Sequence, residues 1–283
     1  MKAGIASIRK ELAGIYAKGE IESLIFLIFE KLKGYSRTQF LLASEEELNE
    51  DDLKEIREIV ARLKNHEPIQ YILGVTEFYG LSFHSVPGVL IPRPETEELV
   101  QWIIQENKNS KPFILDIGTG TGCIAISLQK NISKSTVLAC DISPVCLETA
   151  HRNSELNSAD VSVFQYNILN NTPEISSIPE LDIIVSNPPY IRETEKSLME
   201  KNVLEHEPEL ALFVPDDNPL IFYERIADFS KIHLKNQGFL YFEINEAFGA
   251  ECCKILQEQG YSEIVLKKDI HGKDRMIRCR WIL

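Results

Sequence analysis

The sequence predicts a doubly wound α/β domain with a mostly parallel, seven-stranded sheet, preceded by a small helical domain. From residue 95 onward, short apolar runs alternate with helical segments. This alternation is typical of parallel sheets, in which strands buried on both faces are joined by helices. Seven runs read as strands, namely FILDIG, STVLACD, VSVFQY, LDIIVS, GFLYFEI, YSEIVLK and MIRCRWI. Residues 1–74 show only helical periodicity, which predicts the separate helical domain.

In the first 74 residues, the segments IESLIFLIFEKLKGY and DDLKEIREIVARLKNHEP repeat apolar residues at helical spacing. Pro68 begins one more turn of helix, which Gly74 can close. The next segment, TEFYGLSFHSVPGVLIP, is rich in aromatic and β-branched residues and is interrupted by Gly80 and a Pro-Gly pair. We therefore expect a helical domain over 1–74 that docks a partner, a β-hairpin connector over 75–94, and the sheet domain over 95–283.

Composition limits the classes of function. The 283 residues are 44% hydrophobic and 26% charged, as in an ordinary globular protein. A net charge of −13 disfavours a protein whose main role is to grip a nucleic-acid backbone. The six cysteines form no Cys-x-x-Cys pair and no metal-binding spacing, and the early run LIFLIF is too short to span a membrane. We expect a cytoplasmic protein without a metal or a membrane segment.

The first predicted strand ends in LDIGTGTGC, which indicates a ligand-binding turn before a helix. The candidate cofactor-binding residues here are Asp116, Gly118, Thr119, Gly120, Thr121 and Gly122. Asp141 ends the second strand, where a carboxylate can accept hydrogen bonds from two ribose hydroxyls. The third glycine comes one residue too early for the dinucleotide pattern G-x-G-x-x-G, because Cys123 occupies that position. The spacing favours a nucleoside ligand without a pyrophosphate.

The fourth predicted strand is followed by Asn187, Pro188, Pro189 and Tyr190, again at the carboxyl edge of the sheet. Two prolines make a stiff loop whose carbonyl oxygens have no competing N–H donor. Together with the Asn187 side-chain oxygen they form acceptors for a planar NH2 group, and Tyr190 adds an aromatic face. Such a slot suits methylation of an amide or exocyclic amino nitrogen, whose lone pair is delocalised and which must be oriented to react. We expect Asn187, Pro188 and Tyr190 to be catalytic and all four residues to bind substrate.

In these motifs the chain resembles the HemK/PrmC family, the release-factor glutamine N5-methyltransferases. The resemblance extends over nearly the whole chain, through EPIQYILG, EFYGLSF, VLIPRPETEELV, ILDIGTGTGCIAISL, SNPPYI, EPELAL and DIHGKDRMIRCR. It implies a class I S-adenosylmethionine-dependent methyltransferase fold. It also implies methyl transfer from S-adenosylmethionine to the glutamine amide in the Gly-Gly-Gln loop of peptide chain release factors. In that family the glycine loop, the acid ending the second strand and the Asn of NPPY contact the cofactor, which points to Asp141 and Asn187 here.

Several residues depart from the family pattern or carry no clear role. Where the family has an Asp near the adenine, this chain has Asn167, and we expect Asn167 and Ile168 to contact the cofactor there. His206 replaces an aromatic residue before EPELAL, and we assign it no role. Arg93 could touch substrate or pair with a glutamate, and Glu243, at the end of a strand, could be functional or structural.

Three alternatives compete with this reading. An N6-adenine nucleic-acid methyltransferase would use the same chemistry on another planar amine, but the acidic composition and the small helical domain oppose it. An NAD-type oxidoreductase is disfavoured by the glycine spacing and leaves Asn-Pro-Pro-Tyr unexplained. A non-enzymatic protein that binds S-adenosylmethionine would have no need of that slot. We expect no direct binding of nucleic acid.

Overall fold

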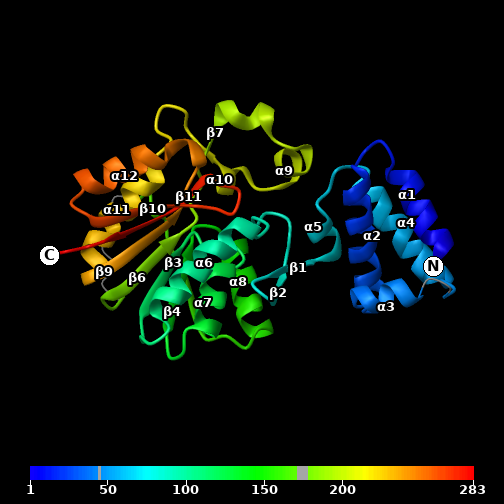
Figure 1. Cartoon of the computed structure of the whole chain (residues 1–283), viewed down its shortest axis with the longest axis horizontal. Coiled ribbons are helices and arrows are strands. Elements are labelled where there is room, and N and C mark those ends of the chain that lie inside the picture. The colour runs from blue at the N-terminus through cyan, green and yellow to red at the C-terminus, as the bar shows by residue number, and fades with distance from the viewer. Residues whose placement is uncertain (44–45, 171–177) are drawn as a thin grey trace. The chain divides into compact units, whose positions relative to one another are not determined.

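The computed structural model describes residues 1–43, 46–170 and 178–283, which divide into two compact units (Figure 1). The helical unit comprises residues 1–74 together with 200–206. The sheet unit comprises residues 75–199 and 207–283. A short segment from the second half of the chain therefore belongs to the helical unit, which the sequence pattern did not predict.

The helical unit is held together by an apolar core. Its helices are α1 (Lys2–Leu12), α2 (Lys18–Lys33), α3 (Arg37–Leu42), α4 (Glu50–Leu63), α5 (Ile69–Leu73) and α9 (Lys201–His206). At the start of α4, Asn49 Oδ1 accepts from the N–H of Asp52 at 2.7 Å, and Asp52 Oδ2 accepts from the N–H of Asn49 at 3.1 Å. This capping box satisfies two N–H groups that a helix start leaves unpaired. The predicted helical turn after Pro68 is confirmed, and Gly74 ends it in the left-handed conformation.

The sheet unit alternates strands and helices over most of its length. Its strands are β1 (Val75–Phe78), β2 (Leu81–His84), β3 (Phe113–Ile117), β4 (Thr136–Asp141), β5 (Val161–Gln165), β6 (Leu181–Ser186), β7 (Ile191–Arg192), β8 (Phe213–Val214), β9 (Leu234–Glu243), β10 (Ser262–Lys268) and β11 (Asp274–Arg280). Its helices are α6 (Pro94–Asn107), α7 (Cys123–Asn131), α8 (Pro144–Leu156), α10 (Glu209–Leu212), α11 (Ile221–His233) and α12 (Gly249–Glu258), with 3₁₀ turns η2 (Glu193–Leu198) and η3 (Glu246–Phe248).

The main sheet has seven strands in the order β10-β11-β9-β6-β3-β4-β5, which confirms the predicted doubly wound, mostly parallel fold. The strands from β9 to β5 pair in parallel, and β11 and β10 pair antiparallel at one edge. Successive residues of β3 face opposite cores, because Ile114 packs in one apolar cluster and Leu115 in the other. The strand order reverses between β3 and β6, and ligands bind at such a reversal in open α/β sheets.

Strands β1 and β2 form the predicted antiparallel hairpin. Its turn residues, Tyr79 and Gly80, have φ angles of 50° and 71°, as a two-residue turn of this hand requires. Phe78 and Phe83 are buried in the core that α6 and α7 cover on one face of the sheet. The hairpin is therefore packed as part of the sheet unit.

The structure also bears on the expectations from composition. Every helix among the described residues is too short or too polar to cross a membrane. All six cysteines are free thiols, and five of them are buried, with Cys253 partly exposed. Within the described ranges, no cluster of three or more His, Cys, Asp or Glu residues is arranged to hold a metal ion.

Candidate active site

The two motifs singled out in the sequence meet where the strand order reverses. Strands β3 and β6 are paired neighbours, with Ile117 opposite Ser186 at their carboxyl ends. Ser186 Oγ donates to the carbonyl oxygen of Ile117 at 2.7 Å, which ties the two strand ends together. The glycine loop leaves β3 at this point and Asn187 leaves β6. Two segments about 70 residues apart thus form one edge of a site, as parallel topology requires.

The glycine loop is held by backbone hydrogen bonds. The N–H groups of Gly118 and Thr119 both donate to the carbonyl oxygen of Cys140, at 2.9 and 3.0 Å. The φ angles of Gly118, Gly120 and Gly122 are 74°, 55° and 82°, a region that other residues rarely adopt. All three glycines are therefore required by the backbone conformation.

The three glycines differ in what lies beside them. A Cβ atom on Gly118 would meet no heavy atom within 4 Å, and one on Gly120 would meet only Val89, at 4.0 Å. A Cβ atom on Gly122 would lie 3.0 Å from Ile126 Cδ1 and 3.2 Å from Ala150 Cβ. Gly118 and Gly120 thus leave open space beside a cavity, whereas Gly122 lets α7 and α8 pack closely. The first two provide the bare backbone that a nucleoside ligand needs to approach.

Two aspartates flank this loop with different environments. Asp116 is fully buried, and burial raises the pKa of its carboxyl to about 7, although the Thr119 hydroxyl donates to it at 2.6 Å and opposes the shift. Asp141 is partly exposed at the end of β4. Its two oxygens accept from the N–H groups of Gly120, at 3.0 Å, and Ser143, at 2.9 Å. These bonds fix the Asp141 carboxylate at the cavity wall and leave lone pairs for ligand hydroxyls.

A cavity that is open to solvent connects these elements. Most predicted site residues line it, namely Gly118, Thr119, Gly120, Thr121, Asp141, Asn167, Ile168, Asn187, Pro188 and Pro189. Asp116, Gly122 and Tyr190 are not among its lining residues. Asn167 is held in a local turn, because its Oδ1 accepts from the N–H of Leu169 at 3.0 Å. The apolar wall also includes Ile142, Leu210 and Phe222, none of which was predicted as a site residue.

Asn187 and Tyr190 leave β6 with different partners. Asn187 Nδ2 donates to the Thr96 hydroxyl at 3.2 Å, so its side-chain oxygen is not used in that bond. The Tyr190 hydroxyl donates to Glu243 Oε1 at 3.2 Å, and the Tyr190 carbonyl accepts from Asn245 Nδ2 at 3.1 Å. Burial raises the pKa of Tyr190 far above its usual value. The Tyr190 ring, which is predicted to stack on the substrate, is partly buried, packs against an apolar core and binds Glu243 through its hydroxyl.

The remaining residues weighed in the sequence also have partners. Arg93 Nη2 forms an ion pair with Glu207 Oε1 at 2.6 Å, and Glu207 Oε2 accepts from the N–H of Ile91 at 3.2 Å. The IPRPETE and EPELAL motifs are thus joined by a carboxylate that is almost fully buried. His206 belongs to the helical unit, where its Nε2 lies 2.9 Å from the carbonyl oxygen of Asn65.

Comparisons with known proteins place this site in a family. Residues 5–74 match the PrmC N-terminal domain, and residues 95–210 match the methyltransferase small domain. A release factor glutamine methyltransferase of Flavobacterium psychrophilum is 47% identical over 276 residues, which is 95% of each chain. The chain belongs to the release factor glutamine methyltransferase family. A second member, from Bacteroides thetaiotaomicron, is 45% identical over 96% of this chain and 97% of its own.

The fold comparison agrees with that assignment. A methyltransferase from Pyrococcus furiosus superposes with a TM-score of 0.53 at 18% identity, over 79% of this chain and 98% of its own. At that identity the likeness concerns the fold alone. The family resemblance stated from the sequence is confirmed, and the enzyme is an S-adenosylmethionine-dependent methyltransferase.

Proposed function

We propose that this enzyme methylates the side-chain amide nitrogen, N5, of the glutamine in the Gly-Gly-Gln loop of peptide chain release factors. The observation that carries the proposal is the position of Asn187 on the cavity wall, with its NH2 group bound to Thr96 and its oxygen left for a ligand. The relatives are named for release factor glutamine methylation, which supports this substrate.

The residues present fit S-adenosylmethionine. Gly118 and Gly120 leave space for a ligand against the backbone, and Asp141 is held where it can accept from ribose hydroxyls. Asn167 and Ile168 lie on the same wall and are our candidates for the adenine contact. When bound, this cofactor supplies an electrophilic methyl group on its sulfonium.

The chain contributes orientation to the methyl transfer. In the proposed mechanism Asn187 Oδ1 and the Pro188 carbonyl accept hydrogen bonds from the two N–H groups of the glutamine amide. These acceptors stabilise the positive charge that develops on nitrogen as the new N–C bond forms. The nitrogen then releases one proton to solvent and keeps one N–H. Orientation of this kind can lower a barrier by roughly 7–11 kcal/mol, so no metal is required.

A nucleic-acid amine remains the second candidate substrate. The net charge of −13 weighs against a phosphate-binding surface, and we propose that the enzyme acts on protein in the cytoplasm. We further propose that the helical unit docks the release factor. Protection of its backbone amides from hydrogen exchange in the complex would test that role.

The test is methyl transfer from labelled S-adenosylmethionine to a purified release factor, followed by peptide mass mapping. We expect one methyl group on the glutamine of Gly-Gly-Gln. Asn187→Ala should lower the rate about 10²–10³-fold, the loss usual for one preorganised active-site contact. Label on a nucleic acid but not on the release factor would support the second candidate. Near wild-type turnover by Asn187→Ala would show that the amide slot is assigned wrongly.

A further inference from the structure

The proposed slot works in only one orientation of the Asn187 side chain. A substrate NH2 group needs the amide oxygen of Asn187, and a rotation of the Asn187 amide by 180° would present a second NH2 group instead. Oxygen and NH2 have nearly the same size, so packing alone does not choose between them. The amide orientation must therefore be set by a neighbour that can only accept a hydrogen bond from Asn187.

Thr96 is that neighbour, in the first turn of α6. It is 2% exposed and its hydroxyl lies between two partners. Thr96 Oγ1 donates to Glu243 Oε2 at 2.6 Å and accepts from Asn187 Nδ2 at 3.2 Å. A hydroxyl has a single proton, and an ionised carboxylate can only accept. While Glu243 is ionised, the Thr96 hydroxyl must use its one proton to donate a hydrogen bond to Glu243. The Thr96 oxygen can then act only as an acceptor toward Asn187.

Glu243, at the end of β9, accepts a hydrogen bond at each of its carboxylate oxygens. It is 1% exposed, and its second oxygen accepts from the Tyr190 hydroxyl at 3.2 Å. Burial raises the pKa of Glu243 above its usual value, and the Thr96 and Tyr190 hydroxyls and the charge of Arg275 oppose that rise. Glu243 does not line the cavity, so it cannot remove a proton from the substrate directly.

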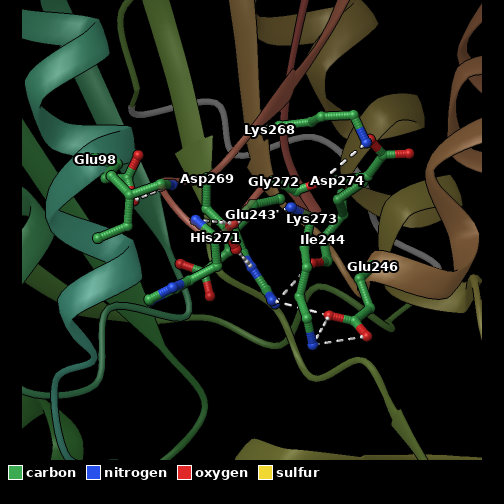
Figure 2. Close-up of polar contacts among 12 residues, drawn as sticks. Glu98, Glu243, Ile244, Glu246, Lys268, Asp269, His271, Gly272, Lys273 and Asp274 are labelled. Atoms are coloured by element: carbon green, nitrogen blue, oxygen red, sulfur yellow. Dashed lines mark hydrogen bonds and ion pairs between the residues drawn. The ribbon is translucent and has the colours of Figure 1, made fainter.

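The cation near Glu243 is held by the loop that joins β10 to β11. Arg275 Nε donates to Asp269 Oδ2 at 3.1 Å, and Arg275 Nη2 lies 3.5 Å from Glu246 Oε2. Asp269 is itself fixed by the N–H groups of His271, at 2.9 Å, and Lys273, at 3.0 Å, and Figure 2 shows this loop beside Glu243. The closing DIHGKDR motif thus supplies a fixed positive charge to the carboxylate.

We propose that Thr96 and Glu243 are positioning residues that fix the Asn187 amide with its oxygen toward the substrate nitrogen. This inference deepens the proposed function and rests on it for the identity of the substrate. It assigns a task to the threonine of IPRPETE and to the glutamate of FEI, which meet across 147 residues of sequence. Tyr190 acts in the same network by donating a hydrogen bond to Glu243.

The test compares Thr96→Val with Thr96→Ser. Valine has the shape of threonine without the hydroxyl, and serine keeps the hydroxyl. We expect kcat with a release factor to fall about 10- to 100-fold in Thr96→Val, as for the loss of one buried hydrogen-bond partner, and to return to within about threefold in Thr96→Ser. The Kd for S-adenosylmethionine should change less than threefold in both. Equal losses of kcat in the two variants would overturn the proposal.

Glu243→Gln tests whether the two residues act as one unit. A glutamine amide can donate to Thr96, which frees the threonine proton to bond the Asn187 oxygen and turn it from the substrate. We expect its loss of kcat to match that of Thr96→Val, and the double variant to lose no more than the worse single variant. Multiplied losses would mean that the two side chains act independently, against the proposal.

Glu106→Gln is a matched control for Glu243→Gln, at a carboxylate on α6, the helix that also carries Thr96. Glu106 is a carboxylate at the far end of α6 that accepts from the Tyr241 hydroxyl, from Trp102 Nε1 and from Arg278. It reproduces a Glu–Tyr–Arg network that does not line the cavity. We expect it to change thermal stability with kcat within about twofold, an energy difference below about 0.5 kcal/mol.

A measurement without substrate separates this inference from the proposed function. In ¹⁵N-labelled enzyme, the Asn187 NH2 pair is identified by its loss in Asn187→Ala. We expect Thr96→Val, but not Thr96→Ser, to shift that pair and to speed its hydrogen exchange. If the wild-type enzyme does not methylate the release factor, the proposed function fails while this readout still decides the positioning role. An Asn187 pair unchanged by Thr96→Val would refute that role whatever the substrate is.

Discussion

The glycines of the loop after β3 should separate ligand binding from stability when each is changed to alanine. Gly118 and Gly122 have φ angles of 74° and 82°, so both substitutions force an L-residue into the left-handed region, at about 1–2 kcal/mol. At Gly118 the added methyl group meets nothing within 4 Å. Gly118→Ala should therefore lose only that backbone cost.

Gly122→Ala adds a steric cost to the same backbone cost. Its methyl group would lie 3.0 Å from Ile126 Cδ1 and within 3.3 Å of the Ala150 Cα atom, which belongs to the backbone of α8. Overpacking of this kind costs about 1–3 kcal/mol in addition. We expect Gly122→Ala to unfold more easily than Gly118→Ala by that difference.

The affinity for S-adenosylmethionine should be affected in the opposite order, with the larger loss in Gly118→Ala. Gly118 lines the cavity and Gly122 does not. The methyl group of Gly118→Ala fills space that the ligand needs, and we expect at least a tenfold weaker Kd for S-adenosylmethionine, or about 1.4 kcal/mol. Gly122→Ala should bind within about threefold of wild type once it is folded.

Tryptophan fluorescence during guanidinium unfolding measures the stability of the sheet unit alone, because both tryptophans, Trp102 and Trp281, belong to it. Calorimetric titration measures the Kd for the cofactor. Equal losses of stability in the two variants, or weaker binding by Gly122→Ala than by Gly118→Ala, would refute the division of roles between these glycines.

Two further predictions concern buried carboxylates of the sheet unit. Asp116 has a pKa raised from 3.8 to about 7, so the native state keeps a proton that the unfolded chain loses as pH rises through that window. The free energy of unfolding of wild type, measured relative to that of Asp116→Asn, should fall by up to about 4 kcal/mol between pH 4 and 7 and then stay constant. A difference that does not change with pH would show that the pKa of Asp116 is not raised. Glu207→Gln should lower the free energy of unfolding by about 1–3 kcal/mol, because it weakens the ion pair with Arg93. An unchanged midpoint of unfolding by tryptophan fluorescence would show that this ion pair does not stabilise the sheet unit.

Much of the fold follows from local sequence. The central strands β3 and β6 are buried on both faces, so their apolar character had to be nearly continuous. Helix α8 begins at Pro144 after the capping side chain of Ser143, and both of these start signals act within one turn. The segment 200–206 escaped prediction, since its membership of the helical unit depends on contacts with residues far away in sequence.

The site was predictable only as far as topology allows. Motifs that end neighbouring parallel strands must meet, so Gly118, Asp141 and Asn187 could be placed at one cavity from the sequence. The sequence did not show that the three glycines have different neighbours. It also did not show which way Tyr190 points, because its hydroxyl partner, Glu243, lies on another strand 53 residues later.

Residues of the most specific motifs of the chain form ion pairs and hydrogen bonds with one another. IPRPETE supplies Arg93 to Glu207 of EPELAL, and Thr96 to Asn187 and Glu243. The DIHGKDR loop supplies the charge of Arg275 near the same Glu243. A buried polar group that loses its partner is costly, so each of these contacts ties two distant segments of the chain together. In the proposed slot Asn187 carries the acceptor oxygen, and Thr96 and Glu243 hold its side-chain amide in place.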